Sequence, residues 1–206
     1  MVGFRLAAHQ KKARRQHAHI ALIDESGLLM APLVRRTWAP RGQTPNLVQR
    51  GGGGGPRPKV SVAAALWLSP RRDRLGLFSK TLPNGYFDSW YMAAFLEAML
   101  KELPGRFVVV WDGGPMHKGD PIHQLTDYFA DRLCLEPLPP WAPMLNPTEP
   151  LWAWLKYDRL CNYTPRDAIE LDGRVIAELA IAGNDQGFLR NLYHASELPL
   201  PRTLLS

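Results

Sequence analysis

The chain has 206 residues, of which 46% are hydrophobic, and its formal net charge is +6. A chain of this length can bury a core without disulfides or metal ions, and Cys134 and Cys161 are neither a disulfide scaffold nor spaced as a zinc site. The longest nearly uninterrupted apolar run, Val60–Leu68, is far shorter than the roughly 18 residues of a membrane span. The N-terminus has no secretory apolar region. Composition therefore favours a soluble cytoplasmic domain and excludes secreted disulfide-rich and membrane proteins.

Charge is distributed unevenly along the chain. Residues 1–80 hold 15 Lys and Arg against 3 acidic residues, a net charge of +12, whereas residues 81–206 hold 10 basic and 16 acidic residues, a net charge of −6. This division indicates a face built for a polyanion. A basic solvated arm followed by an ordinary acidic domain explains it equally well.

The N-terminal region predicts a basic arm and a hairpin. Residues 1–18, with the cationic run Lys11–Arg15, have no apolar period and predict an exposed arm or linker. His19–Asp24 has the length and apolarity of a strand, Gly27 marks a turn, and Leu28–Val34 predicts a returning strand.

A long loop and two further strands are expected next. Arginines, prolines and glycines fill residues 35–58, which predicts a flexible loop with a glycine-rich segment at 49–58. Lys59–Leu68 is rich in small and β-branched residues and predicts a buried strand, and Leu75–Phe78 predicts another short strand.

Helices and strands alternate in the second half of the chain. Asp88 predicts the N-cap of a helix that ends near Leu103, with Tyr91, Phe95 and Met99 along its apolar face. The remaining predicted elements are a strand at Phe107–Trp111, a helix at Pro121–Ala130, a strand at Leu133–Leu138, a helix that opens at Pro147 or Thr148, and a helix from Thr164 to Ala182. This order predicts a mixed α/β fold, with an antiparallel three-strand meander followed by parallel crossover units and flanked by helices.

Three acidic residues stand at the ends of these elements. Asp24 ends the first strand, Asp112 ends the central strand, and Glu149 lies in the first turn of the helix after a proline-rich connector. Carboxylates crowded together repel one another unless a cation neutralises them, and oxygen-only ligand sets suit Mg²⁺ or Mn²⁺. Two such ions can activate a nucleophile and stabilise the leaving oxygen of a phosphodiester. Taken singly, each acid is more simply explained as a turn, cap or helix-dipole residue, and the joint arrangement is what favours a metal site.

Four motifs carry a resemblance to a known family. Leu22–Gly27, Arg36–Pro45, Val108–Lys118 and Leu138–Trp152 together resemble the catalytic domain of mariner-type DDE transposases, in their bacterial insertion-sequence branch. Between Asp112 and Glu149 lie 36 residues, which is similar to the spacing in that superfamily.

The resemblance implies a ribonuclease-H-like fold over residues 19–160, with a C-terminal helical extension and tail over 161–206. It implies that Asp24, Asp112 and Glu149 bind two Mg²⁺ ions, with Mn²⁺ as a substitute. The implied reaction is cleavage of double-stranded DNA at the ends of an insertion sequence, followed by strand transfer into target DNA, by a homodimer that associates with the bacterial nucleoid.

Family members carry helix-turn-helix modules before the catalytic domain, and only 23 residues precede Asp24 here. The expectation is therefore a split transposase with a separately encoded N-terminal half, or a truncated remnant. A nuclease of the same fold and a catalytically silent DNA-binding or dimerisation remnant remain alternatives.

Further residues are candidates for support or DNA contact. Glu25 is expected to face away from Asp24, because strand side chains alternate, and to have a structural or hydrogen-bonding role. Asn146 is expected to brace the connector through side-chain to backbone bonds, and Trp152 to pack in the core. For the basic candidates the alternative is a solvated face, and for His117 it is orientation of its own loop. The candidate DNA contacts are Lys11, Lys12, Arg14, Arg15, Arg36, Arg41, His117, Lys118 and Lys156.

Overall fold

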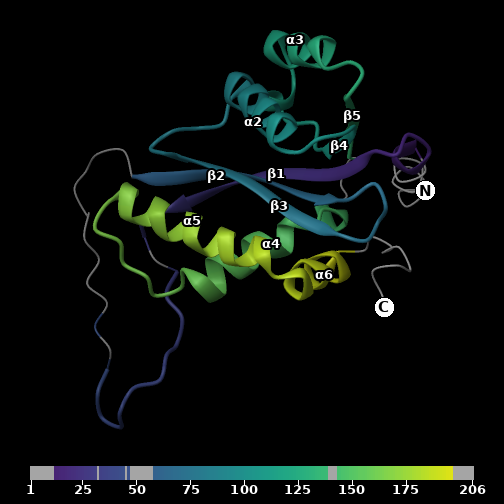
Figure 1. Cartoon of the computed structure of the whole chain (residues 1–206). Coiled ribbons are helices and arrows are strands. Elements are labelled where there is room, and N and C mark those ends of the chain that lie inside the picture. The colour runs from purple at the N-terminus through teal and green to yellow at the C-terminus, as the bar shows by residue number, and fades with distance from the viewer. Residues whose placement is uncertain (1–11, 32, 45, 47–57, 139–142, 197–206) are drawn as a thin grey trace.

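The computed structural model of the chain contains one mixed sheet of five strands in the order β3-β2-β1-β4-β5 (Figure 1). β1, β2 and β3 form an antiparallel meander, and β4 and β5 run parallel to β1. The strands are β1 His19–Leu29, β2 Lys59–Leu68, β3 Leu75–Pro83, β4 Phe107–Trp111 and β5 Leu133–Pro137. The structure describes residues 12–31, 33–44, 46, 58–138 and 143–196.

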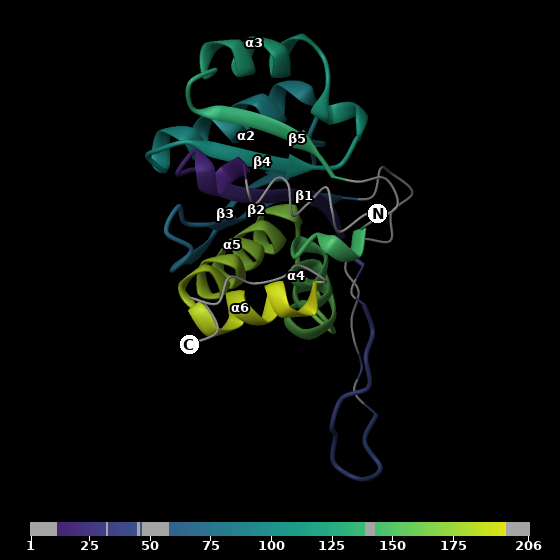
Figure 2. The same cartoon turned by 90° about the vertical axis from the view of Figure 1, so that its right-hand side faces the viewer.

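Helices cover both faces of the sheet (Figure 2). One face carries α2 (Ser89–Glu102) and α3 (Asp120–Tyr128). The other carries α4 (Thr148–Trp154), α5 (Ala168–Asn184) and α6 (Gln186–Ala195). Three short elements complete the fold: η1 (Pro115–His117), η2 (Pro143–Leu145) and the π-helix η3 (Leu155–Arg159).

Strand alternation divides the interior into two apolar layers. In β1, Ile20 and Leu22 join the buried cluster that includes α4 and α5, whereas Ala21 and Ile23 join the cluster under α2. All five residues of β4 are buried, because helices cover it on both sides. No described helix is long and apolar enough to cross a membrane.

The mixed α/β fold with a three-strand meander is confirmed, but the predicted hairpin at Gly27 is wrong. β1 continues through Gly27 to Leu29, and Gly27 pairs with Ser61 of β2. The long β2 offers a partner along all of this stretch, so tertiary pairing overrides the local turn signal. The strand that returns antiparallel to β1 is therefore β2.

Other boundaries move by a few residues. β3 extends to Pro83 instead of Phe78, because β2 pairs with it along its whole length. Asp88 caps α2 as predicted, since its side chain accepts a hydrogen bond from the Tyr91 N–H at 2.9 Å. Tyr91 itself is exposed, so the buried face of α2 is rotated from the predicted one.

The predicted start of the last long helix at Thr164 is wrong, because α5 begins at Ala168. Asp167 provides the N-cap by accepting a hydrogen bond from the Glu170 N–H at 2.8 Å. A separate helix, α6, follows α5 and was not predicted as a distinct element.

The described part of the predicted basic arm, residues 12–18, is not fully exposed. Residues 12–15 form a helical turn, and Ala13 and Ala18 are completely buried. The apolar alanines between the basic residues anchor this segment on the domain. Lys11, most of the glycine-rich segment 49–58 and the tail after residue 196 lie outside the described residues.

We predict opposite effects of alanine at two glycines. At Gly76 in β3, an added Cβ would lie 2.1 Å from the Trp67 ring, whereas at Gly173 in α5 it would meet nothing within 4 Å. Gly76→Ala should lower the free energy of unfolding by about 1–3 kcal/mol through overpacking. Gly173→Ala should raise it by about 0.5–1 kcal/mol, because alanine favours the helix. Urea denaturation followed by circular dichroism measures both; equal effects would contradict the packing of Trp67 against Gly76.

Candidate active site

The register of β1 against β4 brings two of the predicted acids level with each other. Leu22 pairs with Val110, and Asp24 and Asp112 each follow two residues later. Leu22 and Val110 lie in the buried cluster on the α4 side of the sheet. Because side chains repeat every second residue along a strand, Asp24 lies on this same side.

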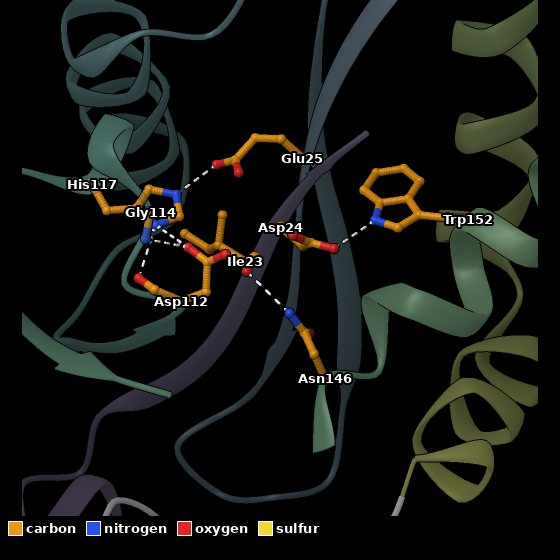
Figure 3. A network of polar contacts seen from close by, with 8 residues as sticks. All are labelled: Ile23, Asp24, Glu25, Asp112, Gly114, His117, Asn146 and Trp152. Atoms are coloured by element: carbon orange, nitrogen blue, oxygen red, sulfur yellow. Dashed lines mark hydrogen bonds and ion pairs between the residues drawn. The ribbon is translucent and has the colours of Figure 1, made fainter. Parts of the chain in front are cut away.

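The helix that carries Glu149 is tied to β1 at this level (Figure 3). The Asn146 side chain donates from Nδ2 to the Ile23 carbonyl at 3.2 Å, and the Trp152 indole Nε1 donates to Asp24 Oδ2 at 2.9 Å. Glu149 lies between these two residues in the chain, in the first turn of α4. Asn146 makes side-chain to backbone bonds of the expected kind, since its Oδ1 also accepts from the Thr148 N–H at 3.2 Å, but these two bonds go to β1 and the start of α4, and bracing of the connector stays a prediction.

Asp24 is in an environment that disfavours its charge. The pKa of this carboxyl is raised to about 6, first by burial and then by the negative charges of Glu149 and Glu25. The hydrogen bond from Trp152 lowers the pKa but does not outweigh these effects. Desolvation and like charges both penalise the ionised form. Negative charge is therefore concentrated around Asp24 without a compensating cation from the described side chains in contact with it.

Asp112 lies at the exposed end of β4, where its loop holds it. Its Oδ1 accepts a hydrogen bond from the Gly114 N–H at 2.8 Å and lies 2.8 Å from His117 Nδ1. His117 Nδ1 also lies 2.9 Å from the Asp112 carbonyl oxygen, and its ring stacks on Trp111 with the centroids 4.3 Å apart. The side chain of His117 is 2% exposed, so these contacts fix the loop from its buried side.

His117 also connects the loop to β1. Its Nε2 lies 2.8 Å from Glu25 Oε1, on the face of the sheet opposite to Asp24 (Figure 3). Burial lowers the pKa of His117, but the hydrogen bond and charge of Glu25, together with Asp112, outweigh burial and raise it above its ordinary value. The predicted alternation of Asp24 and Glu25 and the hydrogen-bonding role of Glu25 are confirmed.

The three acids meet in one region but not at one point. Among the described residues, no group of three or more His, Cys, Asp or Glu is placed to hold a metal ion. Asp24 points toward Trp152, and Asp112 points toward Gly114 and His117 (Figure 3). The oxygen-only donor set and the raised pKa of Asp24 nevertheless fit a hard divalent cation, which would relieve the crowding of negative charge.

The basic candidates differ in their surroundings. Lys12 forms an ion pair with Glu136 and lies 3.0 Å from Cys134 Sγ. Lys156 is half-buried. The exposed candidates are Arg14, Arg15, Arg36, Arg41 and Lys118. Contact of any of these side chains with DNA stays a prediction.

Sequence reasoning placed Trp152 in the core and missed its bond to an acid. The residue is 4% exposed, as expected for core packing, yet its indole reaches Asp24. The available signal was spacing, because residues three apart on a helix share a face and Trp152 follows Glu149 by three.

A sheet of this order, with helices on both faces, has the ribonuclease-H-like fold that was expected from the motifs. Residues 19–172 match the family described as DDE superfamily endonuclease, so the chain belongs to this family. No curated protein matches the chain.

Solved structures of Mos1 mariner transposase share the fold. The paired end complex with Mn has a TM-score of 0.59 at 16% identity, and the match covers 98% of this chain and 57% of the Mos1 chain. The paired end complex with Mg has a TM-score of 0.60 at 18% identity, covering 99% and 58%. The catalytic domain alone has a TM-score of 0.51 at 13% identity, covering 98% and 85%. The chain thus spans little more than half of the Mos1 chains in the paired end complexes.

We predict that Asp24→Asn stabilises the protein at neutral and alkaline pH. Wild-type stability should fall as the pH rises from about 4 to 6, because the folded-state pKa of Asp24 is raised from 3.8 to about 6. Asp24→Asn should remove this loss and unfold with a free energy higher by about 2–3 kcal/mol at pH 8, and be equal to wild type below pH 4. Urea unfolding in EDTA between pH 3.5 and 8 measures this. Asp127→Asn, at an exposed position of α3, is the control and should follow wild type.

We predict that Glu25→Gln lowers the pKa of His117. The raised folded-state pKa of His117 stabilises the protein below the ordinary value of 6.5, and this contribution is lost as the pH rises through the folded-state pKa. Removing the charge of Glu25 leaves burial as the dominant effect, so His117 should titrate at lower pH. NMR titration of the histidine ring protons measures the change. Glu97→Gln, in an exposed pair with Lys101, is the control; an unchanged His117 titration in Glu25→Gln would contradict the assignment.

Proposed function

We propose that this chain is the catalytic core of a mariner-type transposase of the bacterial insertion-sequence branch. It cleaves a phosphodiester bond at the end of a DNA element and joins the freed 3′-hydroxyl to target DNA. The observation that carries the proposal is the register of the parallel strands β1 and β4, which places Asp24 of β1 level with Asp112 just after the end of β4, with α4, the helix of Glu149, hydrogen-bonded to Asp24 through Trp152. Membership of the DDE superfamily endonuclease family supports the same reaction class.

The three acids have distinct positions in this mechanism. Asp24 presents its carboxylate from strand β1, where it is largely buried, and Glu149 presents its carboxylate from helix α4. Asp112 lies on a loop, and its side chain is 58% exposed. These residues would hold two Mg²⁺ ions, with Mn²⁺ as a substitute, and the bound ions would activate the attacking hydroxyl and stabilise the leaving oxygen. Mos1 transposase structures with Mg and with Mn support a divalent ion of this kind.

The protein's own residues restrict how DNA can approach. Without a cation the acids repel a phosphodiester, so charge neutralisation and substrate binding depend on each other. The N-terminal part of the chain, with its excess of basic residues, supplies attraction to the DNA backbone, which weakens as salt rises. Arg36 and Arg41 project on the exposed segment 33–44 and are the foremost candidates.

The proposed assembly is a homodimer on double-stranded DNA, associated with the nucleoid in the bacterial cytoplasm, with a separately encoded N-terminal half that reads the element ends. Solved paired end complexes of Mos1 transposase support action on DNA ends. The chain spans 57% of the first of those Mos1 chains, and the assay below adds the proposed N-terminal half as a separate polypeptide.

We predict that Asp112→Asn and Glu149→Gln abolish Mg²⁺-dependent cleavage of an end-containing duplex while leaving salt-sensitive DNA binding intact. Each substitution removes a negative ligand and keeps the side-chain shape. Cleavage is measured on gels with the N-terminal half added in trans, and binding by fluorescence anisotropy at several salt concentrations. Asp127→Asn is the control and should cleave as wild type does.

The outcomes separate the alternatives. Cleavage by Asp112→Asn at the wild-type rate would contradict the catalytic assignment. A wild type that binds DNA but never cleaves it would indicate a silent remnant, and cleavage without joining would indicate a nuclease.

A further inference from the structure

Trp152 connects the helix of one proposed acid to the side chain of another. It lies one helical turn after Glu149, and its indole Nε1 donates to Asp24 Oδ2 at 2.9 Å (Figure 3). We propose that Trp152 is a positioning residue that orients the Asp24 carboxylate and fixes its spacing from Glu149 for binding of a divalent cation. This inference rests on the proposed function, because it concerns the same site.

The bond is not a by-product of core packing. Leu151, Trp152 and Leu155 are buried in the same apolar cluster, but of these three only Trp152 carries a polar side-chain N–H. A buried indole N–H needs an acceptor, and a carboxylate is the strongest one available. Phenylalanine keeps a six-membered ring at this position but lacks the N–H, so only the indole can make the carboxylate contact.

A second tie makes the spacing rigid. Asn146 binds the Ile23 carbonyl at 3.2 Å, while Trp152 binds the next residue of β1, Asp24. The two ties lie on either side of Glu149 in the chain, before and after the first turn of α4. Helix α4 therefore cannot slide along β1 or rotate without breaking one of these bonds, and carboxylates held in this way need little rearrangement to bind a cation.

Trp154 provides a matched control on the same helix. Its ring packs against Phe188 with the centroids 4.6 Å apart, and the Arg159 guanidinium lies 5.7 Å from the ring centre. Its described contacts are thus with an aromatic ring and a cation and not with a carboxylate. Trp154→Phe removes the same atoms as Trp152→Phe but leaves Asp24 untouched.

The test compares wild type, Trp152→Phe and Trp154→Phe as full chains. Thermal unfolding is followed by circular dichroism in metal-free buffer with increasing Mn²⁺, and the half-saturating Mn²⁺ concentration is read from the shift in Tm. Loss of a partner that orients a ligand weakens metal binding by about 10–100-fold, so Trp152→Phe should need about 10-fold or more Mn²⁺, and Trp154→Phe no more than about twice the wild-type concentration. In cleavage assays kcat should fall for Trp152→Phe, while the KM for DNA is unchanged.

A second measurement works even if Trp152→Phe is less stable. In wild type, the indole N–H signal that is absent in Trp152→Phe is thereby assigned to Trp152; it should be protected from hydrogen exchange and become unprotected in Asp24→Leu. A wild-type Mn²⁺ response retained by Trp152→Phe, or equal weakening in both tryptophan variants, would overturn the inference alone. No Mn²⁺ response in wild type would overturn the proposed function and the inference with it.

Discussion

The parallel pairing of β1 with β4 decides which side chains can meet at the centre of the sheet. With Leu22 opposite Val110, the chain places an acid two residues further on both strands. Because the side-chain period of a strand is two, a register shift of one residue would turn Asp24 to the α2 side and bring Glu25 to the α4 side. The buried residues on both faces of β1 oppose such a shift, so the packing of the core also fixes the site.

The site is built from negative charges that are held by N–H donors. The Trp152 indole N–H donates to Asp24, the Gly114 N–H donates to Asp112, and His117 Nδ1 lies within hydrogen-bond distance of Asp112. The pKa of Asp24 is raised because burial and the like charges of Glu149 and Glu25 outweigh the hydrogen bond from Trp152. Folding thus retains an electrostatic penalty where chemistry is proposed, and perturbed carboxyl groups of this kind are typical of functional sites.

The sequence allowed prediction of features that local physics determines. The apolar run Phe107–Trp111 was correctly assigned as a central strand, and Asp88 as a helix cap. The hairpin at Gly27 was wrong because the decisive interaction, pairing with Ser61, joins residues far apart in the chain. The acids could be named from motifs, but the role of Trp152 could not, since its indole direction depends on how α4 docks against β1.

Neighbouring residues of β1 connect the two faces of the sheet to the same site. Asp24 binds Trp152 on the α4 side, whereas Glu25 binds His117 on the α2 side, and His117 in turn holds Asp112. The loop that carries Asp112 and the helix that carries Glu149 are therefore both bonded to one dipeptide of one strand. Since β1 lies in the middle of the sheet and pairs on both edges, it moves less readily than the loops, and it provides the fixed reference from which Asp112 and Glu149 are positioned. Strand β1 thus orients the site through two side chains on its opposite faces, while the loop after β4 adds Asp112 and helix α4 adds Glu149.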